Sequence, residues 1–144
     1  MRVDERIASV APSRATVLVR GGSPLDRKEI AQALHAQSPR RDEAFSELDC
    51  AQAGTSAIER VFGTAASQRE PYVTRLGTLY VANVESLPLW LQPKLLLFLD
   101  RVSRPRVVVG TERDLAVAMR YGLIRHDLGE RLLLVEIAVA KTKE

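Results

Sequence analysis

Five short apolar runs, several of them rich in β-branched residues, recur along the 144-residue chain. Continuous apolar runs of this length are typical of strands that are buried on both faces of a sheet. We therefore predict five strands, at residues 16–19, 45–48, 79–82, 107–109 and 132–137.

The segments between these runs carry apolar residues three and four positions apart, which is the spacing of one helix face. Helices that alternate with buried strands build a parallel sheet covered on both faces. The predicted fold class is α/β, a doubly wound parallel five-stranded sheet in one domain over residues 1–144, and residues 63–77 are predicted to form a loop. The helix-spaced sets are Ile30, Ala33, Leu34 and Gln37; Ile58, Val61 and Phe62; and Leu115, Ala118 and Met119.

Composition and charge narrow the function classes. The 21 Lys and Arg residues exceed the 18 Asp and Glu residues by only three and are scattered among them, so we expect no direct nucleic-acid binding. No apolar run approaches the roughly 18 to 20 residues of a membrane span, and the N-terminus lacks the layout of a secretory signal. The single Cys50 cannot form an internal disulfide. We expect a cytoplasmic protein without membrane contact.

The turn after the first predicted strand, RGGSPLDRKE at residues 20–29, is the first candidate site. Ligands of doubly wound sheets bind beyond the carboxyl ends of the strands. A phosphate loop of the form G-x-x-x-x-G-K-[ST] binds phosphate there through its backbone N–H groups. Aligning Lys28 with the motif's lysine places Gly22 at the first glycine and Arg27 at the second.

Three residues in this turn oppose nucleotide binding. Arg27 carries a Cβ where the motif uses the freedom of glycine, and Pro24 has no N–H to donate. The Asp26 carboxylate would repel a phosphate about 4 Å away by several kcal/mol at an effective dielectric of about 20. We expect no cofactor, and weak ATP binding through the Arg27 and Lys28 side chains stays open as an alternative.

Further motifs lie along the chain: H-x-x-S-x-R at residues 35–40, GTLYV at 77–81, GTERDL at 110–115 and IRHDLGERL at 124–132. Together they resemble the central AAA+ ATPase domain of bacterial enhancer-binding proteins, the activators of sigma-54 RNA polymerase, over about residues 7–135. The resemblance implies a P-loop NTPase-like (AAA+) fold, here without the helical lid. His35 and Cys50 fall in matched apolar contexts and are predicted to be core residues, and His126 has no second ligand at metal-binding spacing, so no metal is expected.

The chain departs from this family at the Walker B position. The family's third strand ends in an Asp-Glu pair that orders magnesium and activates water, whereas this chain has Ala82 and Asn83 there. Phosphoryl transfer depends on metal and oriented water, which these two side chains do not supply. We expect a pseudo-ATPase rather than an enzyme.

Two family elements that contact other subunits or proteins bear on the partner. The family's G-A-F-T-G-A loop is missing from residues 64–76, so no sigma-54 contact is expected. Arg125 and Arg131 match family arginines that reach a neighbouring subunit's nucleotide. They are candidate arginine fingers acting in trans, although a local role is favoured, with Arg125 capping a helix and Arg131 pairing with Asp127.

The segment SLPLWLQPKLLLFLDRV, residues 86–102, is apolar around more than one helix face. Pro88 suits a helix start, and Leu89, Leu96 and Leu99 are predicted to form the buried face. A second apolar face is either further core or an interface for a protein partner or for self-association. The candidate interface residues are Trp90, Leu91, Leu97 and Phe98.

Three functions remain open at this point. The favoured one is a catalytically inactive domain that acts as a binding or regulatory module in transcription. A residual ATP-binding regulator would rely on Lys28, Thr111 and the two arginines Arg125 and Arg131. The third is a structural remnant of a larger regulator.

Overall fold

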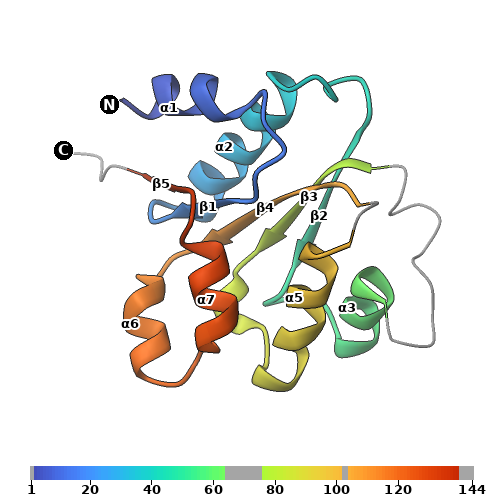
Figure 1. Cartoon of the computed structure of the whole chain (residues 1–144), viewed down its shortest axis with the longest axis vertical. Coiled ribbons are helices and arrows are strands. Elements are labelled where there is room, and N and C mark those ends of the chain that lie inside the picture. Colours follow the sequence, from blue (N-terminus) through green and yellow to red (C-terminus); the bar gives the residue numbers. More distant parts are fainter. Residues whose placement is uncertain (1, 64–75, 102–103, 140–144) are drawn as a thin grey trace.

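The computed structural model describes residues 2–63, 76–101 and 104–139. Five strands form one sheet in the order β2-β3-β4-β1-β5, and every adjacent pair is parallel (Figure 1). The strands are β1 (Val17–Arg20), β2 (Ala44–Asp49), β3 (Leu76–Ala82), β4 (Arg106–Thr111) and β5 (Glu136–Ala138).

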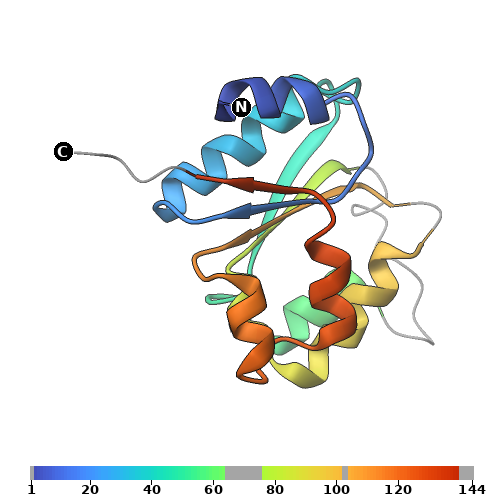
Figure 2. The ribbon, with the colours of Figure 1, turned by 60° about the vertical axis from the view of Figure 1, so that its left-hand side comes forward.

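Helices cover both faces of this sheet (Figures 1 and 2). One face packs against α1 (Val3–Val10) and α2 (Pro24–Ala36). The other packs against α3 (Thr55–Phe62), α5 (Gln92–Leu99), α6 (Leu115–Arg120) and α7 (His126–Leu132). Two short 3₁₀ turns, η1 (Val84–Ser86) and η2 (Leu89–Leu91), connect β3 to α5.

The central strands are apolar on both sides because their side chains alternate between two cores. Val17 and Val19 of β1 contact the α1–α2 side, and Leu18 between them contacts the opposite side. In β4, Val108 belongs to the first core and Val107 to the second. The double-sided burial explains why these runs are continuous rather than alternating.

The predicted doubly wound five-stranded sheet is confirmed, although β3 begins at Leu76, three residues before its predicted start. The apolar run at 132–137 is not a single strand, because Leu132 ends α7 and β5 begins only at Glu136. Helix α1 was not predicted; it has eight residues, of which only Ile7 is buried. The predicted loop at 63–77 lies outside the described residues except at its ends, where Gly63 caps α3 and β3 begins at Leu76.

Among the described residues, no helix has the length and apolar character that crossing a membrane requires.

Candidate functional site at the carboxyl edge of the sheet

The turn between β1 and α2 contains Gly21 and Gly22, of which Gly22 is the residue aligned with the first glycine of the phosphate-loop motif. Gly21 and Gly22 have φ values of +92° and +66°, which L side chains rarely adopt. The Gly21 N–H donates to the carbonyl of Thr111 at 2.9 Å, so the turn lies beside the end of β4. A Cβ on Gly22 would approach the Val139 side chain to 2.8 Å, so the segment after β5 packs closely against this turn.

Helix α2 begins inside the segment that corresponds to the phosphate loop. Ser23 is its N-cap and Pro24 is at its first turn. The Ser23 hydroxyl accepts from the Asp26 N–H at 3.0 Å, and the Asp26 carboxylate accepts from the Ser23 N–H at 3.0 Å. This reciprocal capping box satisfies N–H groups that a phosphate loop would direct to its ligand.

The Arg27 side chain folds back under the same turn. It is 2% exposed, and its Nη1 donates to the carbonyls of Gly21 and Gly22 at 3.0 and 2.8 Å. Burial raises the pKa of Tyr80 on β3 to about 12, and the nearby Arg27 charge opposes that rise. Arg27 therefore holds the glycine turn from beneath, and its guanidinium fills space next to Tyr80.

Lys28 is engaged with a neighbouring strand. Its Nζ lies 3.0 Å from the Glu47 carboxylate on β2, and 41% of its side chain is exposed. A surface ion pair of this kind contributes about 0 to 1 kcal/mol. The side chain that would reach outer phosphates in a working loop is thus paired to the sheet by a weak contact.

The end of β3 carries no ionisable group at the two predicted Walker B positions. Ala82 is buried, and Asn83 adopts a left-handed conformation with φ 57°. The Asn83 amide donates to the Asp49 carboxylate on β2 at 2.7 Å. Glu85 lies beyond the strand in η1, where one of its carboxylate oxygens is buried without a hydrogen-bond partner among the described residues.

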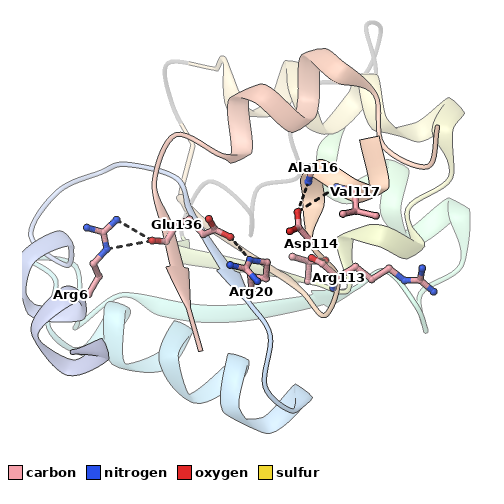
Figure 3. A network of polar contacts seen from close by, with 8 residues as sticks. Arg6, Arg20, Arg113, Asp114, Ala116, Val117 and Glu136 are labelled. Carbon is pink, nitrogen blue, oxygen red and sulfur yellow. Dashed lines mark hydrogen bonds and ion pairs between the residues drawn. The ribbon is translucent and has the colours of Figure 1, made fainter. Parts of the chain in front are cut away.

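Thr111 at the end of β4 is buried and bonds to its own turn. Its hydroxyl donates to the Arg113 carbonyl and accepts from the Arg113 N–H, each at 3.2 Å. Asp114 then caps α6 by accepting from the N–H groups of Ala116 and Val117 (Figure 3). The GTERDL segment at residues 110–115 therefore forms a locally hydrogen-bonded turn.

A polar network connects β5 to β1 and α1 (Figure 3). Arg20 at the end of β1 forms an ion pair with Glu136 of β5, and this hydrogen bond raises the pKa of Arg20. Arg6 of α1 donates to the Glu136 carbonyl at 3.0 Å. One residue of β5 thus joins β1 and α1.

The two candidate finger arginines form different ion pairs from the predicted one. Arg125 precedes α7 and binds Asp127 through two hydrogen bonds, which lowers the pKa of Asp127. Arg131 pairs with Asp100, at the end of α5, and not with Asp127. The predicted Arg131–Asp127 pair is therefore wrong, because Arg125 occupies the Asp127 carboxylate.

The candidate interface divides into core and surface. Leu91 and Phe98 are 0% and 1% exposed, so their assignment to an interface is wrong: they pack against the sheet. Trp90 and Leu97 are 59% and 66% exposed. Leu89, predicted to be buried, is also exposed, because residues 89–91 form a 3₁₀ turn and α5 begins only at Gln92.

His35 and Cys50 are core residues, as predicted. The His35 ring bonds at 2.8 Å to both the Thr78 hydroxyl and the Glu43 carbonyl. Burial raises the pKa of Cys50 to about 12, so its thiolate is scarce at neutral pH. Within residues 2–63, 76–101 and 104–139, no three His, Cys, Asp or Glu side chains cluster as metal ligands.

The parallel strand order and the glycine turn between β1 and α2 define a P-loop NTPase fold of the AAA+ type. The chain matches the Sigma-54 interaction domain over residues 1–138, and it belongs to that family. It is 31% identical over 160 residues to the transcriptional regulatory protein ZraR of Escherichia coli (strain K12), covering 96% of this chain and 36% of ZraR. The chain thus spans about a third of the length of the curated relatives it matches.

Solved structures agree with this assignment. The structure of NtrX from Brucella abortus in complex with ATP has a TM-score of 0.79 to this chain at 25% sequence identity. The match covers 95% of this chain and 36% of the NtrX chain. The P-loop NTPase domain of the sigma-54 transport activator from E. coli has a TM-score of 0.71 at 17% identity, covering 97% and 93% respectively. The second likeness supports the fold alone.

Proposed function

We propose that this chain is a sigma-54-activator-type AAA+ domain that does not hydrolyse ATP and acts as a binding or regulatory module in transcription control. The observation that carries the proposal is the start of α2 within the loop segment, with the buried Arg27 bonded to both glycine carbonyls. The capping box engages the Ser23 and Asp26 N–H groups, and the Gly21 N–H donates to Thr111, so these three donors are not free to bind a phosphate. The Arg27 side chain holds the carbonyl side of the same turn.

The end of β3 supports the absence of hydrolysis independently. A metal-assisted phosphoryl transfer needs oxygen ligands and a group that orients water. Ala82 supplies neither, and the Asn83 amide is bonded to Asp49. Two parts of the ancestral chemistry are therefore altered, one at the phosphate loop and one at the Walker B strand.

Retained ATP binding is the second candidate. NtrX is a relative whose solved structure contains ATP. In this chain, the Lys28–Glu47 pair is partly exposed, so breaking it requires little free energy. A residual ATP-binding regulator would need Lys28 to leave Glu47 and the Ser23–Asp26 cap to open.

A direct test is phosphate release by the purified chain in magnesium-ATP. We expect release at the rate of a protein-free control, unchanged in a Lys28→Ala variant. Turnover above that control, lost in Lys28→Ala, would contradict the proposal and favour the second candidate.

A protein partner is part of the proposal, and Arg125 gives it a testable form. Arg125 is exposed and held by the neighbouring Asp127, so it is available to an adjoining active AAA+ subunit. In a mixed complex, Arg125→Ala should change the partner's ATP turnover without changing complex mass. The matched control is Arg120→Ala, an exposed arginine on α6. If complexes with Arg125→Ala and with Arg120→Ala hydrolyse ATP at the same rate, Arg125 is not an arginine finger for the partner.

A further inference from the structure

A second candidate site lies at the amino edge of the sheet, at the opposite end of the strands from the glycine turn. A cavity of about 170 Å³ is bounded there by residues 12–14, 38–40 and Arg106. Residues 12–14 precede β1, residues 38–40 precede β2, and Arg106 is the first residue of β4. The cavity is therefore separate from the ancestral nucleotide position.

Three arginines line this cavity and none has an acidic partner in the described parts of the chain. Arg14 donates to the Arg104 carbonyl at 3.0 Å, and Arg40 donates to the Gly77 carbonyl at 3.4 Å. Arg106 donates only to carbonyls that follow α1 or end it. The positive charge around the cavity is thus balanced by backbone dipoles and not by carboxylates.

Arg106 provides a fixed, buried cation. It is 1% exposed, and its hydrogen bonds to three backbone carbonyls use three of the five guanidinium N–H groups. Burial lowers the pKa of Arg106, and burial together with the Arg14 and Arg131 charges lowers the pKa of Arg104 next to it. An anion in the cavity would favour the charged form of Arg106, which burial disfavours.

The walls of the cavity are held in shape by short-range contacts. The Ser38 hydroxyl donates to the His35 carbonyl at 2.7 Å and accepts from the Arg40 N–H at 3.1 Å. Pro12 and Pro39 restrict the two loops that approach each other. Arg40 is therefore presented from a turn whose backbone is already ordered.

We propose that this cavity binds a small oxyanion of the phosphate class, held by Arg14, Arg40 and Arg106. Guanidinium groups match the planar edges of phosphate oxygens and are the preferred side chains for that recognition. At about 170 Å³ the cavity is smaller than the roughly 300 to 1,000 Å³ that drug-sized ligands occupy. The phosphate group itself is the part that fits inside.

The experiment titrates the full 144-residue chain with inorganic phosphate while sodium chloride keeps the ionic strength constant. Backbone amide NMR shifts should saturate at residues 13–14 and 38, 40 and 41. Arg14→Gln and Arg40→Gln should each weaken binding about tenfold or more, as expected for losing a charge-assisted hydrogen bond. Arg120→Gln, which removes an exposed arginine from α6, should leave the affinity unchanged.

A parallel titration with glycerol 3-phosphate distinguishes the two sources of the group. Tighter binding of the ester identifies a phosphomonoester as the ligand, and tighter binding of inorganic phosphate identifies the free ion. Thermal melts of each variant verify that Arg14→Gln and Arg40→Gln remain folded. Shifts that chloride reproduces, or an equal loss of affinity in Arg120→Gln, would overturn the proposal and leave Arg106 as a cap for α1.

Discussion

Arg27→Ala is expected to lower the free energy of unfolding by about 3 kcal/mol, and the melting temperature by roughly 10 °C. The substitution removes two charge-assisted hydrogen bonds to the Gly21 and Gly22 carbonyls and empties space beside Tyr80. Lys28→Ala should change the free energy of unfolding by less than about 1 kcal/mol, because it removes only a partly exposed ion pair. Thermal and denaturant unfolding of the two variants measure the difference.

Arg27→Met is the matched control, since it keeps most of the side-chain volume and removes the donors. We expect Arg27→Met to be more stable than Arg27→Ala and less stable than the unsubstituted chain. The first difference measures the contribution of packing, and the second measures the contribution of the hydrogen bonds. In a nucleotide-binding loop the lysine is the side chain that reaches phosphate, and glycine stands at the Arg27 position. Equal stability of Arg27→Ala and Lys28→Ala would contradict the structural role given to Arg27.

Phe98→Ala should destabilise the chain by about 3 to 5 kcal/mol, the range for removing a buried phenyl ring. Phe98 is 1% exposed, its ring centroid lies 5.4 Å from that of Phe62, and the Arg101 guanidinium lies 5.4 Å from the ring. Leu97→Ala, on the next residue, should change stability by no more than about 0.5 kcal/mol, because that side chain is 66% exposed. Denaturant unfolding of both variants tests this contrast.

The same pair separates core from interface. Leu97→Glu should leave the chain folded and reduce any self-association or partner binding that uses the Trp90–Leu97 surface, as measured by analytical ultracentrifugation. Phe98→Glu cannot test that interface, because it places a charge in the core. A stable Phe98→Ala variant combined with an unfolded Leu97→Ala variant would reverse the assignment of the two positions.

The sheet could be predicted from the sequence because its central strands are buried on both faces. Runs such as residues 107–109 remain apolar whichever side they face, so they are visible without any tertiary information. The sequence pattern was less informative at the ends of helices and strands. In residues 132–137, helix and strand meet with apolar residues on both sides of the junction, and periodicity alone does not separate them.

The direction of the Arg27 side chain could not be predicted in the same way. It depends on the residue at which α2 begins, and a phosphate-loop alignment places that start after Arg27. The Ser23-x-x-Asp26 pattern was the available signal, since a hydroxyl followed three residues later by an acid marks a helix start. A helix that starts at this cap includes Arg27.

The arginine pairs illustrate a second limit. Spacing of four residues favoured an Arg131–Asp127 contact on one helix face. Arg125 lies just before α7 and reaches Asp127 first, while Arg131 contacts Asp100, which is 31 residues away in the chain. A contact between α7 and the end of α5 is set by packing across the sheet face, which helix spacing does not report.

Calorimetry with magnesium and a non-hydrolysable ATP analogue tests the central claim most directly, because it measures occupation of the loop without requiring hydrolysis. We predict no saturable heat at millimolar ligand for the unsubstituted chain and for Lys28→Ala alike. Saturable binding of one nucleotide per chain that Lys28→Ala abolishes would contradict it.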